Sequence, residues 1–364
     1  MSGLPNISIR TDVPAMAAEG WDAFVRHNHP VRFFLRDGEM VEFVEHRDRT
    51  SLSAVTFARF VHTLRRVASW TRGGVDKGPP QSVAHDMFAE PRKPLPFLER
   101  MWNAPAFVPP GVLLRDAGYH PLSRTYLALD SQLVVGAIPE QPTSAQIRAA
   151  VELYTNDLLV DFPFVADRDR AHALALALLP FVRSLIPGPT PLHLIRKPMP
   201  GAGATLMAKS LLAPFVGQAT PASEAKSNEE WRKRLTAAFR RLPSYIWIDN
   251  LGDRLDSVAL STCLSSESTS DRLMQTSDEI ELHIHCAWVA TGNNPTLSPE
   301  IARRTVPISI DPQMERPQER AEFKHRLPDW AITNRARLIE AACVMIQAWI
   351  AAGKPAAPNL APLG

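Results

Sequence analysis

The chain carries at Pro200–Thr205 a Pro-Gly-Ala-Gly-Ala-Thr turn that resembles a phosphate-binding loop without its lysine. In the motif G-x-x-x-x-G-K-(S/T), backbone N–H groups cradle phosphates, the lysine reaches the β- and γ-phosphates, and the Ser/Thr hydroxyl binds magnesium. Gly201, Gly203 and Thr205 supply this frame, and Ala204 stands where the lysine belongs. Because a Pro/Gly-rich run is more often an ordinary turn, residues downstream must decide whether nucleotide phosphates bind here.

A carboxylate and an amide follow two apolar stretches downstream of this loop. Ser244–Ile248 is apolar and leads into Asp249, an acid of the type that holds the water shell of magnesium against the β- and γ-phosphates. His285–Gly292 leads into Asn293 and Asn294, and a neutral amide there can hydrogen-bond the attacking water or the γ-phosphate. We expect Asp249 and Thr205 to hold the metal, and Asn293, ahead of Asn294, to contact the phosphate or water.

Arg303 and Arg304 end a short predicted helix directly before another apolar strand. An arginine in this place can project into the nucleotide of a neighbouring subunit and stabilise the charge of the transition state. A pair of surface arginines is the simpler explanation in isolation. Following Asp249 and Asn293 in this order, the pair is better interpreted as an arginine finger.

The elements that position these residues follow from hydrophobic periodicity. Residues 191–195 read as a short buried strand and 205–212 as a helix, so the order strand, loop, helix would place phosphate at a helix N-terminus. Further upstream the pattern predicts a β-hairpin over 31–44, around Asp37-Gly38, and an exposed linker over 71–98. The helices predicted upstream of the loop cover residues 14–27, 53–70, 144–158 and 169–185.

Composition bounds the class of protein. The 364 residues are 45% hydrophobic and 21% charged, with a net charge of +2, which neither predicts nor excludes nucleic acid. The three cysteines form no C-x-x-C pair, and no secretory signal or bilayer-spanning run is present in the sequence. We expect a cytoplasmic protein that has no membrane partner.

Taken together, these residues make the chain resemble a known family. The series Pro-Gly-Ala-Gly-Ala-Thr, Trp-Ile-Asp-Asn, Ala-Thr-Gly-Asn-Asn and Arg-Arg, together with 315–320, is similar to the AAA+ ATPase module of phage and mobile-element replication helicases. That module is related to superfamily III helicases and to viral primase-helicases. The resemblance is strongest over 160–353 and weaker over 1–150.

The resemblance implies a homo-oligomer, a hexameric ring, that binds ATP with Mg²⁺ between subunits and DNA in its central pore. It implies Asp249, Asn293, Arg303 and Arg304 as catalytic residues. The nucleotide would be held by Pro200, Gly201, Ala202, Gly203, Ala204 and Thr205, and Lys197 is a further candidate from the same loop. A hairpin over 270–284 would enter the pore, with Arg272 either contacting the DNA backbone or serving as a structural or inter-subunit ion-pair residue.

Two departures from the family pattern bear on hydrolysis. Losing the lysine at Ala204 should cost on the order of 10²-fold or more in rate. Three explanations for the loss compete: an engineered hydrolysis-dead variant, a natural branch with a substitute lysine, and a degenerate scaffold. Lys197, in the same loop, could fold back toward the phosphates, whereas Lys209 would point away from them. Asn250 stands where many AAA+ proteins have a water-activating glutamate, and Asp253 is the nearest alternative acid.

The expected architecture is α/β. A small α+β N-terminal domain with Pro-rich linkers (1–145) precedes an AAA+ P-loop domain with a parallel sheet (146–312), and a helical segment with a flexible tail (313–364) follows. The expected function is an ATP-dependent DNA helicase. The alternatives are a non-hydrolysing DNA-binding or assembly scaffold and a regulatory nucleotide switch without DNA. Relatives tend to continue past such a Pro-Leu-Gly ending, so a truncated form is also expected.

Overall fold

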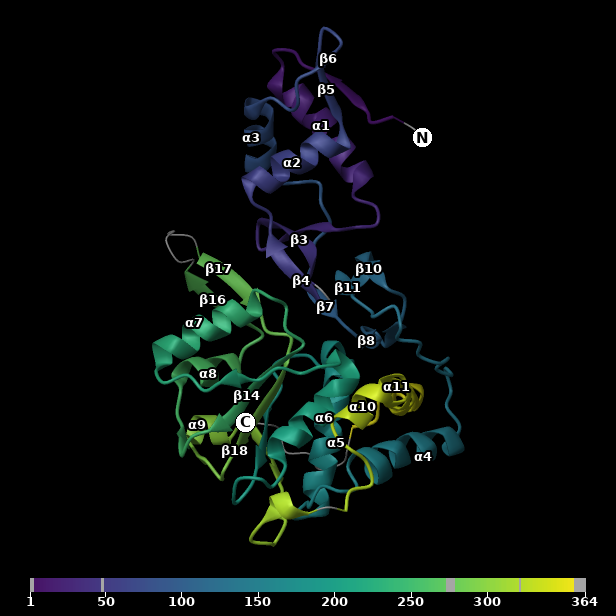
Figure 1. Ribbon diagram of the computed structural model, residues 1–364, viewed down its shortest axis with the longest axis vertical. Coiled ribbons are helices and arrows are strands. Elements are labelled where there is room, and N and C mark those ends of the chain that lie inside the picture. Colours follow the sequence, from purple (N-terminus) through teal and green to yellow (C-terminus); the bar gives the residue numbers. More distant parts are fainter. Residues whose placement is uncertain (1–2, 47–48, 273–278, 321, 357–364) are drawn as a thin grey trace. The chain divides into compact units, whose positions relative to one another are not determined.

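The structure is a computed structural model that describes residues 3–46, 49–272, 279–320 and 322–356 (Figure 1). The chain divides into two compact units. The N-terminal unit comprises Met1–Glu99 and Gly118–Tyr126, and the C-terminal unit comprises Arg100–Ala117 and Leu127–Gly364. Residues 100–117 and 127–145, assigned from sequence to the N-terminal domain, thus belong to the C-terminal unit.

The N-terminal unit contains the sheets β1-β5-β6 and β2-β3-β4 and the helices α1, α2 and α3, which contribute to one apolar core. The predicted hairpin is confirmed as β2 and β3, with Asp37 and Gly38 in left-handed conformation at its turn. The linker predicted over 71–98 is wrong, because α3 occupies Gln81–Ala89 and buries Val83, Ala84 and Met87 completely. The elements are β1 (Asn6–Ser8), α1 (Val13–His27), β2 (Phe33–Arg36), β3 (Glu39–His46), β4 (Arg49–Ala54), α2 (Phe57–Val67), β5 (Ser69–Arg72), β6 (Val75–Asp76), α3, and β10 (Gly118–His120).

A five-stranded parallel sheet forms the centre of the C-terminal unit, as the predicted α/β class requires. Its strand order is β13-β14-β18-β12-β20, and the residue ranges are β13 (Ala222–Ser223), β14 (Tyr245–Leu251), β18 (Ala287–Gly292), β12 (Leu192–Arg196) and β20 (Thr305–Ser309). All four neighbouring pairs are parallel. The carboxyl ends of the strands therefore meet at one edge, where open parallel sheets bind ligands.

Helices cover both faces of this sheet (Figure 1). On one face, Ile195, Trp247 and Val289 pack with α5 (Asp167–Val182), α6 (Ala204–Val216) and α11 (Arg335–Ala351). On the other, Leu194, Ile248 and Trp288 pack with α7 (Asn228–Phe239) and α8 (Val258–Cys263). Successive strand residues thus enter opposite cores, which explains why these strands are apolar throughout rather than alternating.

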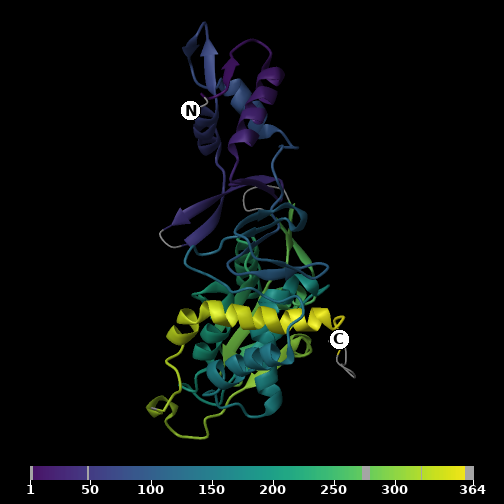
Figure 2. The same ribbon diagram turned by 90° about the vertical axis from the view of Figure 1, so that its right-hand side faces the viewer.

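The other elements of the C-terminal unit surround this three-layer core. They are β7 (Arg100–Trp102), β8 (Ala106–Val108), β9 (Val112–Leu114), α4 (Ser144–Glu152), a π-helical stretch over Leu153–Leu158, β15 (Arg254–Leu255), β16 (Ser268–Arg272), β17 (Glu279–His283), β19 (Thr296–Leu297), α9 (Pro299–Ala302) and α10 (Asp329–Thr333). The strand β11 (Thr125–Leu127) ends at the first residue of the second segment of this unit. Figure 2 shows α11 running across the C-terminal unit as a long straight helix.

The predicted hairpin over 270–284 is confirmed in its two strands, since β16 and β17 pair antiparallel from Ser268 opposite His283 to Arg272 opposite Glu279. Its tip and the tail from residue 357 onward lie outside the described residues. Among the helices described, none combines the length and the apolar character needed to cross a bilayer.

Candidate nucleotide-binding site

The glycine-rich loop connects the end of β12 at Arg196 to the start of α6 at Ala204. Gly201 and Gly203 have φ values of +83° and +97°, a region that side-chain-bearing residues rarely adopt. Gly203 is the N-cap of α6, a helix of 13 residues, and no side chain caps the helix start. The first N–H groups of α6 therefore have no side-chain acceptor and are directed toward the loop, as an anion site requires.

Asp249 lies beside the first turn of α6. The Thr205 hydroxyl donates a hydrogen bond of 3.0 Å to Oδ1 of Asp249. The Thr291 hydroxyl donates one of 2.5 Å to the same oxygen. The first turn of α6 and the strands β14 and β18 are thereby joined through a single carboxylate, which is half-buried.

Strand order explains how these side chains meet. Because β18 lies between β12 and β14, Thr291 on β18 separates the loop strand from the strand that carries Asp249. The register of β14 with β18 shifts between Ile248 and Leu251, and Asn250 in this bulge has φ +57°. The Asn250 N–H donates to Oγ1 of Thr291 over 2.9 Å, and the exposed side chain of Asn250 is directed away from the core.

The two asparagines of the Thr-Gly-Asn-Asn run follow directly after β18. The carbonyl of Gly292 accepts a 3.1 Å hydrogen bond from the N–H of Lys197, so Asn293 begins beside the start of the loop. Asn293 and Asn294 are both exposed, and Asn294 has φ +47°. The structure therefore places Asn293 at the same edge of the sheet as Asp249 and the loop.

Arg303 and Arg304 lie at the opposite edge. The carbonyl of Arg304 accepts a 2.8 Å hydrogen bond from the N–H of Leu192, the first residue of β12. The loop follows the last residue of β12, which at 5 residues is about 13–16 Å long. Arg303 is exposed, and Arg304 donates to the carbonyl of Glu300 over 2.6 Å. Within one chain, neither arginine joins the loop and Asp249.

The residues around the missing lysine differ in burial. Ala204 is completely buried at the start of α6, and Ala202 is 6% exposed. Lys197 is 9% exposed, although it is a lysine in a loop. Lys209, farther along α6, is exposed.

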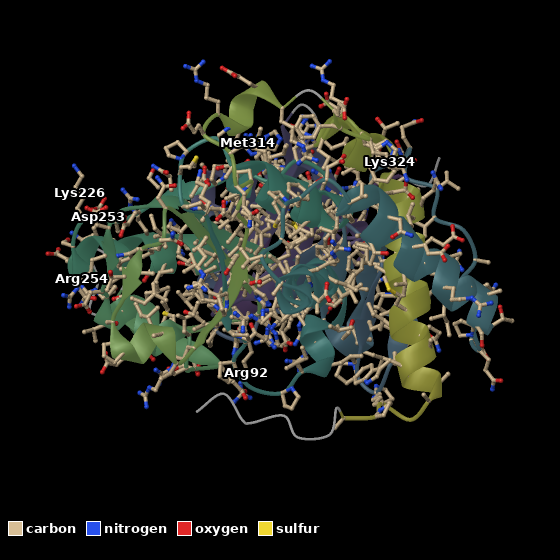
Figure 3. The ribbon with its side chains drawn as sticks, turned by 90° about the horizontal axis from the view of Figure 1, so that it is seen from below. Arg92, Lys226, Asp253, Arg254, Met314 and Lys324 are labelled. Carbon is tan, nitrogen blue, oxygen red and sulfur yellow. The ribbon has the colours of Figure 1, made fainter. Side chains whose placement is uncertain are left out.

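The remaining predicted residues lie outside this group. The backbone of Arg272 pairs with Glu279, and its side chain lies outside the described residues. The neighbouring Asp271 accepts a 2.5 Å hydrogen bond from the Thr236 hydroxyl, which ties β16 to α7. Asp253 is exposed at the outer margin of the C-terminal unit (Figure 3).

Sequence reasoning missed two side chains that shape the site. Thr291 is the hydrogen-bond partner of both Asp249 and Asn250. Its position directly before Gly292 and the two asparagines was the available signal. Phe162 lies against the loop, because a Cβ built on Gly203 would sit 3.8 Å from its ring.

The residues at this edge fit a magnesium–nucleotide complex. Mg²⁺ keeps several waters and is usually bound by one or two carboxylates together with substrate phosphates. One carboxylate and one hydroxyl meet here, at Asp249 and Thr205. Within the described ranges no group of three or more His, Cys, Asp or Glu side chains could hold a metal by itself. A metal at this site would therefore depend on phosphate oxygens.

A buried histidine underlies the site. Burial, and to a smaller extent the nearby His172, lowers the pKa of His193 on β12 to about 4. His193 is therefore neutral at pH 7. It lies inside the α5 side of the sheet and does not supply charge to the loop.

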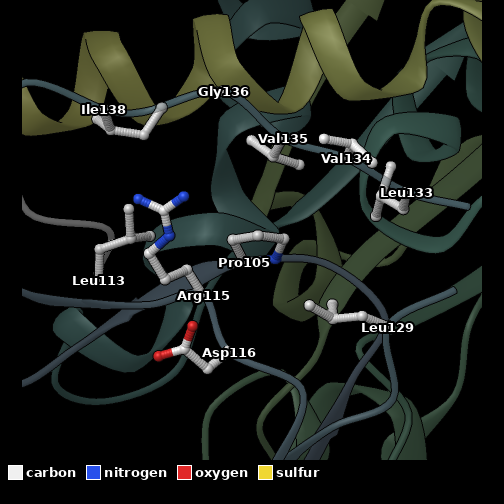
Figure 4. Close-up of a pocket in the computed structure, with 10 residues that line it drawn as sticks. All are labelled: Pro105, Leu113, Arg115, Asp116, Leu129, Leu133, Val134, Val135, Gly136 and Ile138. Carbon is white, nitrogen blue, oxygen red and sulfur yellow. The ribbon is translucent and has the colours of Figure 1, made fainter. Parts of the chain in front are cut away.

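A separate pocket lies elsewhere in the C-terminal unit (Figure 4). Its volume is about 230 Å³. Its lining is aliphatic except for Arg115 and Asp116, and consists of Pro105, Leu113, Arg115, Asp116, Leu129, Leu133, Val134, Val135, Gly136 and Ile138. None of the residues predicted to act on nucleotide lines it.

Comparison with known proteins adds similarities of shape. No family model matches the chain, and no curated protein matches it. It is similar to two apo structures of the NrS-1 C terminal region, at 10% identity, with TM-scores of 0.48 and 0.44, covering 89% and 90% of this chain and 68% of each of those chains. It is also similar to a JCV helicase bound to a thiazolopyridine compound, at 14% identity and a TM-score of 0.25, over 57% of this chain and 62% of that chain. All three TM-scores are below 0.5, so the function has to be argued from the site residues.

Proposed function

We propose that the chain is an AAA+ nucleoside triphosphatase that binds ATP with Mg²⁺ at the carboxyl edge of its sheet and acts as a DNA helicase. The observation that carries this proposal is the 3.0 Å hydrogen bond from Thr205 to Asp249. It joins the first turn of the helix after a glycine loop to a carboxylate on another parallel strand. A chance turn between a strand and a helix would have no reason to meet an acid at this point.

In this proposal, Gly201, Gly203 and the N-terminus of α6 hold the phosphates. Thr205 and Asp249 hold the metal, whose charge would be balanced against the β- and γ-phosphates. Asn293 would contact the γ-phosphate or the attacking water. The position of these residues at one edge of the sheet supports these roles.

The assembly part of the proposal rests on the arginine pair. Arg303 and Arg304 lie a strand length away from the loop of their own chain. They can serve a nucleotide only if it is bound by another copy, which favours a homo-oligomeric ring with sites between subunits. DNA would pass through its pore, beside the hairpin of β16 and β17.

We place the protein in the cytoplasm. All three cysteines are free and buried, and burial raises the pKa of each thiol. Buried thiols with raised pKa are unreactive, which suits a reducing compartment without requiring one.

The test is ATP-dependent assembly and strand displacement. The unaltered chain is mixed with Mg²⁺, ATP and a forked DNA labelled with a fluorophore and a quencher, and its mass is followed by light scattering. We expect larger assemblies with nucleotide, and DNA binding that weakens with salt. A chain that stays monomeric with ATP and DNA, and separates no strands, would contradict the helicase.

A non-hydrolysing scaffold is the second candidate, and Ala204 favours it. The fully buried methyl of Ala204 offers no charge to a transferring phosphate, and Asn250 is exposed without a carboxylate. A scaffold predicts assembly and DNA binding that persist in Asp249→Ala. Measurable magnesium-dependent ATP turnover by the unaltered chain would remove this candidate.

A further inference from the structure

We propose that Lys197, from the beginning of the loop, supplies the phosphate-binding charge that Ala204 lacks. The inference rests on the proposed nucleotide site, and it assigns the charge that acts there. It also selects among the explanations for Ala204. The phosphate-binding lysine would then lie after the end of the strand rather than at the start of the helix, and the site would keep a cation for the β- and γ-phosphates.

Burial without a partner is the first observation. Lys197 is 9% exposed, so most of its side chain is packed within the protein. Among the residues that the structure describes, its side chain makes no ion pair and no hydrogen bond, and its ammonium nitrogen is not fully enclosed. Packing thus holds the stem while the ammonium group has no anion from the described part of the chain beside it. The group is therefore available to a bound anion, and nucleotide phosphate is the anion expected at this loop.

The orientation of Lys197 is the second observation. Its N–H donates to Gly292 on β18, whereas the carbonyl of Arg196 accepts from Ile310 on the β20 side. Lys197 therefore continues the alternation of β12 and shares a face with Ile195. Ile195 packs in the same apolar cluster as Ala204, the first residue of α6. The side chain of Lys197 is thus on the α6 side of the sheet.

The neighbours of Lys197 on that face include the residues that meet at Asp249. Ile195 is aligned with Thr291, whose hydroxyl binds Asp249. One pleat beyond Ile195, Lys197 lies at the edge where Thr205 meets Asp249. Lysine acts on phosphate as a compact point charge with three donors, so it does not need the planar geometry of arginine. It can therefore contact phosphate oxygens from the strand end as well as from the helix.

Lys209 is the natural comparison. It lies four residues after Thr205 on α6, but its side chain is exposed to solvent. A solvated lysine gains little by approaching phosphate and needs no counter-ion. Lys209→Met therefore serves as the matched control for Lys197→Met, since both replace a lysine with an apolar chain of similar length.

The experiment measures equilibrium binding of a fluorescent ATP analogue with Mg²⁺, together with urea unfolding of each protein without nucleotide. We expect Lys197→Met to weaken binding about 10- to 150-fold, the worth of one hydrogen bond to a charged group. Lys209→Met should bind like the unaltered chain. Lys197→Met should unfold at nearly the same urea concentration as the unaltered chain, because methionine can fill the space of the buried stem and no ion pair within the described residues is lost. A structural role for Lys197 would instead lower that midpoint.

Inorganic tripolyphosphate, used as a competitor, identifies the part of the nucleotide that Lys197 contacts. It should displace the analogue from the unaltered chain and Lys209→Met, and displace it more weakly from Lys197→Met. Equal binding by Lys197→Met and the unaltered chain, within twofold, would overturn the assignment of Lys197 alone. Failure of the unaltered chain to bind either probe would overturn the proposed nucleotide site, and the Lys197 assignment with it.

Discussion

Asp249→Asn is the most informative single change to the site. In the structure, Oδ1 of Asp249 accepts from the Thr205 and Thr291 hydroxyls. Asparagine keeps the shape and one acceptor oxygen but removes the negative charge. The fold should therefore survive this change, and a magnesium-dependent function should not. Asp249→Ala is the harsher comparison, because both hydroxyls lose their acceptor.

The magnitudes follow from the geometry. A hydrogen bond to a charged group contributes about 1.5–3 kcal/mol in a dry site, and the half-buried position of Asp249 lets water replace part of it. We expect Asp249→Ala to cost about 2 kcal/mol of unfolding free energy and Asp249→Asn about 1 kcal/mol or less. Asp249→Asn removes a unit charge near a divalent ion, and solvent and water ligands screen part of that effect. We therefore expect the factor by which Mg²⁺ increases the affinity for an ATP analogue to fall about 10- to 100-fold.

The assay compares the affinity for an ATP analogue with and without Mg²⁺ for the unaltered chain and both variants. Affinity in EDTA should be nearly unchanged in Asp249→Asn, since its loop is intact. The gain on adding Mg²⁺ should be lost. An Asp249→Asn protein that retains the full magnesium effect would refute the assignment of Asp249 as the metal-positioning acid.

Four further changes test other parts of the molecule. Arg335→Ala should lower the unfolding free energy by about 2–4 kcal/mol in urea, because its guanidinium donates to three main-chain carbonyls, whereas exposed Arg337→Ala should cost under about 0.5 kcal/mol. His193 has a folded-state pKa of about 4, below its unfolded value of about 6.5, so the unfolded chain binds more protons between these values. Stability should therefore fall as pH drops from about 6.5 toward 4, by up to about 1.4 kcal/mol per pH unit from this group, and His193→Leu should show a shallower slope in urea titrations. Gly203→Ala, at φ +97°, should cost about 1–3 kcal/mol and weaken binding of the ATP analogue; unchanged binding would show that the left-handed turn is not needed. Arg303→Ala should bind nucleotide normally but lose turnover, and mixing it with Asp249→Asn subunits should restore part of the turnover, which an arginine acting within its own chain would not allow.

Much of the C-terminal unit could be predicted from local pattern. The strand before the loop, the helix after it and the strand that carries Asp249 were all expected within a few residues of their observed bounds. The reason is that buried parallel strands are short continuous apolar runs, and a glycine pair marks the turn between strand and helix. The N-terminal unit was harder to predict. Helix α3 was taken for a linker because its three buried residues lie among Gly, Pro and charged neighbours.

The residues of the candidate site likewise differ in whether the sequence alone could predict them. Thr205, Asp249 and Asn293 could be singled out because each one follows or begins a regular element and has the right chemical type. Thr291 lies directly before the run that contains Asn293, but its contact with Asp249 requires β18 to lie between β12 and β14, and no local pattern shows that strand order. The position of the arginine pair relative to the loop depends on the same strand order, through the pairing of β20 with β12.

The amino-acid sequence shows directly the two glycines of the loop, Thr205, Asp249 and their order along the chain, because these are matters of local composition and periodicity. Their convergence on one carboxylate is a product of long-range pairing, as are the burial of Lys197 and the placement of Arg303 at the opposite edge. Strand order depends on which apolar faces pack together across many residues, and no local pattern encodes that choice. The sequence therefore shows that the lysine is missing at Ala204 and that Lys197 and Lys209 lie nearby, whereas only the fold, through the burial of the Lys197 side chain, favours Lys197 over Lys209.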